Sequence, residues 1–159
     1  MTARTLQHPS VLLVDDESFS EEIVSHGLKA CGQHTFRFTP HAASAVDVAR
    51  EMAATVVLVD MRMPGMDGFE VTRRLCADKH TEHVAVIILS SEDNPDMKAR
   101  AFEVGASDYL VKWPDPRELV ESWESSGRFR NVTVELGKDA REVDIKADVV
   151  RTAPEGSEP

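Results

Sequence analysis

The sequence has few basic residues, few cysteines and no long apolar run, and each of these shortages argues against a class of protein. Basic residues are outnumbered, with 18 Lys and Arg against 28 Asp and Glu, so direct binding to nucleic acid is not expected, because phosphates attract positive charge. The two cysteines, Cys31 and Cys76, are too few for a disulfide framework and predict reduced thiols in a cytoplasmic protein. No apolar run approaches the length of a membrane span, so no membrane insertion is expected. The run at residues 11–14 is also too short for a signal peptide.

Short apolar runs alternate with helical patterns along the chain, whose 159 residues are about enough for one domain. Unbroken runs rich in β-branched residues predict buried strands, and apolar residues at helical spacing predict helices between them. Five strands alternating with five helices predict an α/β fold, a doubly wound parallel sheet with helices on both faces. The predicted strands are residues 11–14, 34–39, 56–59, 84–89 and 107–111.

Capping residues mark where the five helices are expected to begin. Ser18 has Glu21 three residues later, the spacing of a capping box. Asp67 is a suitable cap for the helix after the central strand. The other three starts combine a cap with proline in the first turn, and they are Thr39-Pro40, Asn94-Pro95 and Asp115-Pro116.

Polar residues with complementary chemistry follow four of the predicted strands: Asp15 and Asp16, Asp60, Ser90, and Lys112. Carboxyl ends of parallel strands meet at one edge of a sheet, so we expect these side chains to lie together. Three crowded carboxylates repel one another and favour a divalent cation such as Mg²⁺ or Mn²⁺. A hydroxyl and a lysine beside them suit a phosphoryl group. The set predicts phosphoryl transfer to Asp60 as the nucleophile, with Asp15 and Asp16 at the metal site.

Each of these residues also has an ordinary structural interpretation when it is considered alone. Asp60 could cap the next helix, Ser90 could be a routine hydroxyl at a strand end, and Tyr109 could be a half-buried core aromatic. Their joint placement on one edge is what favours the chemical interpretation.

Four separated motifs resemble those of the receiver domains of two-component response regulators. They are Asp15-Asp16, Asp60 followed by Met-Pro-Gly-Met-Asp-Gly at residues 63–68, Ser90-Ser91, and Gly-Ala-Ser-Asp-Tyr-Leu-Val-Lys at residues 105–112. They match the family in type, order and spacing, and the resemblance covers roughly residues 10–126. Within the family, the chain looks most similar to receivers placed ahead of GGDEF-type diguanylate cyclases.

The resemblance implies a flavodoxin-like fold with strand order 2-1-3-4-5, and it assigns a role to each residue of the site. Asp60 is the phosphoacceptor, and the donor is a phosphohistidine on a sensor histidine kinase or a phosphotransfer protein. Asp16, Asp60 and the backbone carbonyl of Arg62 coordinate Mg²⁺ directly, and Asp15 acts mainly through water. Lys112 bridges the phosphoryl group and a carboxylate.

The resemblance also implies a switch and an output surface. Ser90 moves toward the phosphoryl group, and Tyr109 turns inward as it does so. The surface that changes lies around the fourth helix, the fifth strand and the fifth helix. It binds a downstream protein or a second copy of the chain.

Three positions near the site are particular to this chain. Arg62 and Glu92 occupy positions that in the family tune loss of the phosphoryl group, and we expect their opposite charges to pair and hinder the hydrolytic water. Lys112 is followed by Trp113 and Pro114 where the family usually has Lys-Pro with a cis peptide. The sequence leaves open whether the Lys112–Trp113 peptide is cis.

Two other functions remain open from the sequence. One is a degenerate receiver that serves as a phosphorylation-independent scaffold, although the complete set of acids, hydroxyl and lysine argues against it. The other is an aspartyl-phosphate phosphatase of the haloacid dehalogenase type, which needs a second Asp two residues after the nucleophile, where this chain has Arg62. As a receiver, the chain is not an enzyme beyond slow self-catalysed phosphorylation and dephosphorylation.

The two ends of the chain differ from the middle. Residues 1–9 have no periodicity and are expected to form a loose leader, residues 10–126 the receiver domain, and residues 127–159 a C-terminal extension. Alternating apolar residues on either side of Gly137-Lys138-Asp139 predict a β-hairpin, followed by a disordered end from Ala153. A disordered stub of a longer protein is the alternative. The extension is too short for a DNA-binding or cyclase output domain, which predicts a stand-alone receiver.

Overall fold

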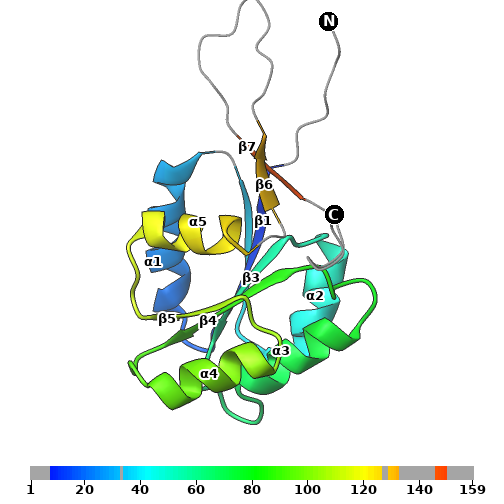
Figure 1. The fold of residues 1–159 in the computed structure, drawn as a ribbon, viewed down its shortest axis with the longest axis vertical. Coiled ribbons are helices and arrows are strands. Elements are labelled where there is room, and N and C mark those ends of the chain that lie inside the picture. The colour runs from blue at the N-terminus through cyan, green and yellow to red at the C-terminus, as the bar shows by residue number, and fades with distance from the viewer. Residues whose placement is uncertain (1–7, 33, 127–128, 133–145, 150–159) are drawn as a thin grey trace, which may run out of the picture.

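The computed structural model describes residues 8–32, 34–126, 129–132 and 146–149. Strands and helices alternate along most of the chain (Figure 1). The strands are β1 (Ser10–Val14), β2 (Thr35–Thr39), β3 (Val56–Asp60), β4 (Ala85–Ser90), β5 (Asp108–Val111), β6 (Phe129–Val132) and β7 (Lys146–Val149). The α-helices are α1 (Phe19–Leu28), α2 (Ala45–Glu51), α3 (Gly68–Ala77), α4 (Pro95–Glu103) and α5 (Pro116–Glu124). Two short 3-10 helices, η1 (Lys29–Cys31) and η2 (Ala42–Ser44), precede β2 and α2.

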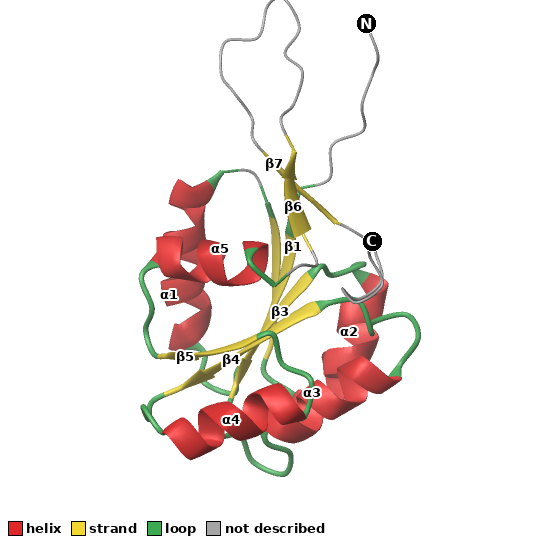
Figure 2. Ribbon diagram, viewed as in Figure 1, coloured by secondary structure: helices red, strands yellow, loops and turns green. Residues whose placement is uncertain are grey.

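The first five strands form a parallel sheet in the order β2-β1-β3-β4-β5. The helices cover both faces of this sheet, with α1 and α5 on one side and α2, α3 and α4 on the other (Figure 2). This arrangement confirms the predicted doubly wound fold and its strand order.

The central strands are apolar throughout because both of their faces are covered. In β1, Leu12 and Val14 pack with α2 and α3, whereas Val11 and Leu13 pack with α1 and α5. All four of these side chains are fully buried. Such two-sided burial explains why the sequence shows unbroken apolar runs in place of an alternating pattern.

Three of the predicted helix caps are confirmed. The Asp67 carboxylate accepts the N–H of Glu70, the Asn94 side chain accepts two N–H groups at the start of α4, and the Asp115 carboxylate accepts the N–H of Arg117. Each bond satisfies a backbone donor that the first helical turn leaves without a partner inside the helix. The loops that lead into α3, α4 and α5 are therefore fixed by local chemistry.

Of the two other predicted starts, the one at Ser18 has the right position but lacks the predicted capping box, and the one at Thr39-Pro40 is wrong. Ser18 has a helical backbone conformation and makes no capping bond with its side chain. The side-chain bond to the backbone at this point comes from Asp15, whose carboxylate accepts the N–H of Glu17 at 3.0 Å in the turn before α1. Thr39 remains in β2, and the helical segment begins at Ala42, after Pro40.

β6 and β7 form a separate antiparallel pair, with Phe129 opposite Val149. The predicted turn at residues 137–139 and the predicted disordered end from residue 153 lie outside the described residues, as does most of the leader. The division into leader, receiver and extension therefore stays a prediction. Within the described ranges, the structure has no helix with the length and apolar character needed to cross a bilayer.

Candidate functional site

The carboxyl ends of β1, β3 and β5 bring together Asp15, Asp60 and Lys112. The Lys112 ammonium nitrogen lies 2.9 Å from Asp60 Oδ1 and 3.2 Å from Asp15 Oδ2. The side chain of Asp15 is fully buried, and those of Asp60 and Lys112 are only 11% and 14% exposed. One shielded cation thus offsets the repulsion between two shielded carboxylates.

Asp16 adds a third carboxylate from the exposed side. Asp15, Asp16 and Asp60 each offer an oxygen, and these atoms all lie within 4.8 Å of one another. Three carboxylates beside one ammonium leave an excess of negative charge. Hard oxygen donors with excess negative charge suit Mg²⁺ or Mn²⁺, so the residues present fit a divalent cation.

The surroundings shift the proton affinities of Asp60 and Lys112. Burial raises the pKa of the Asp60 carboxyl above its usual value, and the negative charges of Asp15 and Asp16 act in the same direction against the hydrogen bond from Lys112. Burial alone would lower the pKa of Lys112, but its bond to Asp60 and the charge of Asp15 outweigh burial and raise that pKa. Lys112 is therefore a permanent cation at neutral pH.

Ser90 and Tyr109 lie next to this cluster and share one neighbour. The Ser90 hydroxyl oxygen accepts the backbone N–H of Glu92 at 3.1 Å. The Tyr109 hydroxyl donates to the backbone carbonyl of Glu92 at 2.8 Å, and its ring is buried. Both proposed switch residues are thus joined through the backbone of Glu92, and Tyr109 already points inward.

Arg62 and Glu92 form an ion pair. Arg62 Nη2 lies 3.2 Å from Glu92 Oε1 and 3.3 Å from Oε2. The two side chains are 66% and 47% exposed, so water screens the pair. The predicted pairing of the opposite charges is therefore present, and it joins the loops after β3 and β4. Its effect on the rate at which the phosphoryl group is lost stays a prediction.

An open cleft of about 310 Å³ leads to the carboxylates, and Asp60 and Lys112 lie in its wall. Phe19 and Trp113 also line the cleft, although the sequence motifs predict no role for either of them in the site. Phe19 is 53% exposed, and nothing in its sequence position indicates that it faces the cleft. The Lys112–Trp113 peptide is cis.

Comparisons with known proteins agree with this geometry. Residues 11–124 match the family model described as the response regulator receiver domain. The chain belongs to this family. The chain is 36% identical over 112 residues to the phosphate regulon transcriptional regulatory protein PhoB of Pseudomonas aeruginosa, covering 70% of this chain and 48% of PhoB. It is 32% identical over 126 residues to the response regulator PleD of Caulobacter vibrioides, covering 79% of this chain and 28% of PleD.

Other relatives of this receiver chain are matched over nearly their whole length. Protein PilH of Pseudomonas aeruginosa is 32% identical over 112 residues, which cover 70% of this chain and 92% of PilH. The solved structure of the chemotaxis response regulator CheY4 of Vibrio cholerae superimposes with a TM-score of 0.67 at 27% identity, covering 76% of this chain and 99% of CheY4. The chain nevertheless spans about half or less of PhoB and PleD, and the narrower likeness to receivers ahead of diguanylate cyclases stays a prediction.

Proposed function

We propose that this receiver domain accepts a phosphoryl group on Asp60 from a histidine kinase or a phosphotransfer protein of a two-component system. The observation that carries the proposal is the contact of Asp60 with Lys112 beside Asp15 and Asp16, at the end of an open cleft. A carboxylate so placed can be reached by a donor and has a cation beside it where negative charge develops.

The transfer is a displacement at phosphorus. An oxygen of Asp60 forms a P–O bond while the P–N bond of the phosphohistidine breaks, and the departing imidazole nitrogen keeps the electron pair and takes up a proton. Asp16, Asp60 and the backbone carbonyl of Arg62 would hold Mg²⁺ directly, and Asp15 would act through water. When bound, the ion offsets negative charge on the transferred group.

Lys112 and Ser90 stabilise the transferred group from the protein side. The Lys112 ammonium, 2.9 Å from Asp60 Oδ1, donates to a phosphoryl oxygen while it keeps its contact with Asp15. Ser90 accepts in its bond with Glu92, so its own hydroxyl hydrogen can be donated to a second phosphoryl oxygen.

Movement of Ser90 provides the switch. If Ser90 turns to the phosphoryl group, its bond with the Glu92 N–H breaks, and the Glu92 carbonyl that holds the Tyr109 hydroxyl shifts as well. Tyr109 is part of β5, so the change reaches the surface of α4, β5 and α5. Phe102 and Val111 are exposed on this surface and provide apolar area for a downstream protein or a second copy of the chain.

Three parts of the proposal concern the chain as a whole. Residues 10–126 are the receiver, flanked by a leader at residues 1–9 and an extension at residues 127–159. The protein acts in the cytoplasm and turns over no substrate beyond slow self-catalysed gain and loss of the phosphoryl group. The alternatives of a scaffold and of a phosphatase have less support, since the buried ion pairs of Lys112 favour chemistry at Asp60 and Arg62 stands where a phosphatase needs an acid.

The test is intact-mass analysis of the protein with Mg²⁺ and acetyl phosphate, followed by gel filtration. We expect one phosphoryl adduct on the parent and none on Asp60→Ala, whereas Asp93→Ala, which removes an exposed carboxylate from the loop after β4, keeps the adduct. A size increase that accompanies the adduct would identify self-association as the output. Absence of any adduct on the parent without hydrolysis of acetyl phosphate would support the scaffold, and rapid hydrolysis with no adduct that accumulates would support the phosphatase.

A further inference from the structure

Trp113 places its ring beside the ammonium of Lys112. The Lys112 nitrogen lies 4.8 Å from the centre of the ring, within the range of a cation–π interaction. The indole is partly buried and packs against the core between the sheet and the helices α1 and α5. It also lines the cleft that leads to Asp60, so a ring anchored in the core forms one side of the pocket around the ammonium.

The three contacts of the Lys112 ammonium differ in what phosphorylation does to them. Asp60 is the group that becomes an acyl phosphate, so its 2.9 Å ion pair with Lys112 is altered by the reaction. Asp15 lies at 3.2 Å from the ammonium and belongs to the acidic cluster that suits a divalent cation, so its negative charge would be shared between Lys112 and that cation. The Trp113 ring is neutral, binds no metal and does not react.

We propose that Trp113 is a positioning residue that holds the Lys112 ammonium in place for the phosphoryl group. This inference rests on the proposed function, because it assigns Trp113 a part in the transfer to Asp60. The ring face attracts the cation whichever anion the cation pairs with, so the ammonium keeps its place while its partner changes from a carboxylate to a phosphoryl oxygen. The indole also shields this side of the ammonium from water.

The experiment varies the charge on the ring face with little change of shape. The chain has two tryptophans, so Trp123→Phe leaves Trp113 as the site of incorporation for tryptophan with one, two, three or four ring fluorines. Trp123 suits this replacement, because its buried indole N–H has no hydrogen-bond partner among the described residues. Each added fluorine weakens the attraction between cation and ring while the ring remains in the core.

We expect the rate of phosphorylation by acetyl phosphate at saturating Mg²⁺ to fall stepwise with each fluorine. The total loss should be about threefold to tenfold, the size of a partly buried cation–π interaction. The matched control is Trp113→Phe, in which only Trp123 carries the fluorines and the rate should not depend on their number. Dependence on ring fluorination is a readout that a role in packing alone would not produce.

A second measurement tests the geometry without any phosphoryl transfer. In NMR spectra, the ring current of Trp113 should shift the protons of the Lys112 side-chain end upfield, and Trp113→Leu should abolish this shift. If Trp123→Phe is phosphorylated at one rate whatever the number of fluorines on Trp113, the inference alone is overturned, and an absent ring-current shift has the same consequence. A parent that forms no adduct overturns the proposed function and, with it, this role of Trp113.

Discussion

Lys112 holds together a site whose other charged groups repel one another. Its ammonium pairs with the buried carboxylates of Asp15 and Asp60. A single cation among three carboxylates has two opposite effects, because it assists the developing phosphoryl charge and competes with a divalent cation for the same oxygens. Separate measurements of rate and metal affinity can therefore distinguish these effects.

Replacement of Lys112 by Met should change those two quantities in opposite directions. We expect phosphorylation by acetyl phosphate to slow by about 100-fold to 1,000-fold, as when one donor to a developing oxyanion is removed. Mg²⁺ affinity should rise by roughly tenfold, because the competing charge is lost. Intact mass followed over time measures the rate of phosphorylation, and isothermal titration calorimetry measures the Mg²⁺ affinity. The control is Lys98→Met on the exposed side of α4, which should change neither quantity. A fall of both the rate and the Mg²⁺ affinity, in Lys98→Met or in Lys112→Met, would contradict the explanation.

The Arg62–Glu92 ion pair is expected to slow the loss of the phosphoryl group. Removal of the guanidinium in Arg62→Ala should speed hydrolysis of the adduct by about twofold to fivefold, which corresponds to the worth of an exposed ion pair. The half-life of the adduct measures the effect. Arg74→Ala, which breaks an exposed ion pair with Glu70 on α3, should leave the half-life unchanged. An unchanged half-life in Arg62→Ala would remove the idea.

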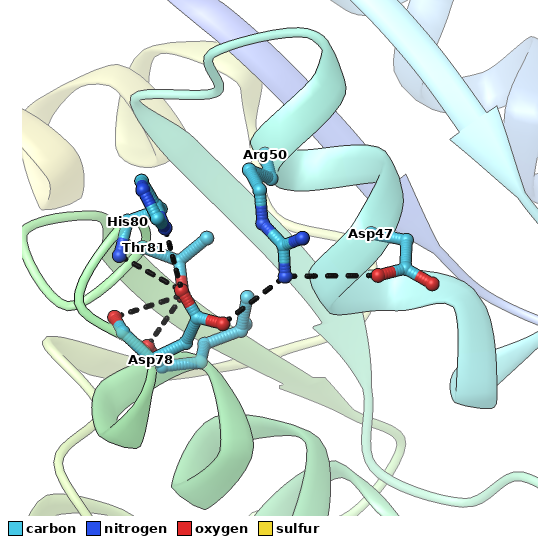
Figure 3. Close-up of polar contacts among 6 residues, drawn as sticks. Asp47, Arg50, Asp78, His80 and Thr81 are labelled. Carbon is cyan, nitrogen blue, oxygen red and sulfur yellow. Dashed lines mark hydrogen bonds and ion pairs between the residues drawn. The ribbon is translucent and has the colours of Figure 1, made fainter.

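A polar network joins the ends of two helices, α2 and α3, that cover the same face of the sheet. Figure 3 shows Asp78, which follows α3, between His80 and the guanidinium of Arg50 on α2. Asp78 Oδ1 accepts the backbone N–H of His80 at 2.8 Å, and Oδ2 lies 3.2 Å from Arg50. The Thr81 hydroxyl donates to the carbonyl of Leu75 and completes the end of α3. This network joins α2 to the turn that leads into β4.

The Asp78 network predicts a dependence of stability on pH. The His80 N–H, aided by Arg50, lowers the pKa of Asp78 below its usual value in the folded protein. The ionised carboxylate therefore stabilises the fold above the unfolded pKa, and this stabilisation is lost as pH falls through the lower folded pKa. In urea unfolding, the difference between the parent and Asp78→Asn should be constant near neutral pH and shrink below about pH 4. The control is Asp47→Asn, because the Asp47 carboxylate also pairs with Arg50 but is 80% exposed, and its difference in unfolding free energy from the parent should be much smaller. A difference for Asp78→Asn that grows in acid would contradict the argument.

The turn between α4 and β5 needs glycine for two separate reasons. Gly105 has φ +110°, and an added Cβ would lie 2.7 Å from Cys76 Sγ on α3. Gly105→Ala should therefore destabilise the protein by more than the roughly 1–2 kcal/mol of an unfavourable backbone conformation. The matched control is Gly65→Ala, since Gly65 has φ +82° and an added Cβ there meets no atom of the described structure within 4 Å.

A double variant separates the two reasons. Gly105→Ala combined with Cys76→Ala removes the clash but keeps the unfavourable φ, so its stability relative to Cys76→Ala should resemble the effect of Gly65→Ala. Denaturant unfolding of the parent, the three single variants and the double variant gives these free energies. If the alanine at residue 105 costs as much with Cys76 as without it, close approach to α3 plays no part.

For the whole molecule, the carboxyl edge of one sheet provides most of the chemistry. A divalent cation that binds this edge only in the folded state should raise the unfolding free energy, by about 2.7 kcal/mol at a hundred times the dissociation constant. Thermal unfolding of the parent should shift upward with Mg²⁺ or Mn²⁺, and that of Asp16→Ala should shift much less. Asp93→Ala should respond as the parent does, and an equal shift in all three proteins would place the ion elsewhere.

The sequence predicted the parts of this molecule that depend on position along the chain. Asp60 and Lys112 directly follow buried strands, so the direction of the sheet alone brings them to one edge. The ring of Trp113 beside Lys112 and the shared contacts of Ser90 and Tyr109 with Glu92 depend on rotamers and packing across elements, which spacing does not encode. The absent bond of the Ser18 side chain, beside the bond of the Asp15 carboxylate to the Glu17 N–H, is likewise a matter of side-chain orientation.

The ion pair between Asp15 and Lys112 joins residues 97 positions apart. During translation at about 5–20 residues per second, roughly 5–20 seconds separate the synthesis of its two partners. For about the second half of that interval the ribosome-bound chain carries Asp60 but lacks the cation beside it. Under the proposed function, the nascent chain should therefore be a poor phosphoryl acceptor until β5 has emerged and joined the sheet, so a kinase should encounter a competent substrate only after folding is nearly complete.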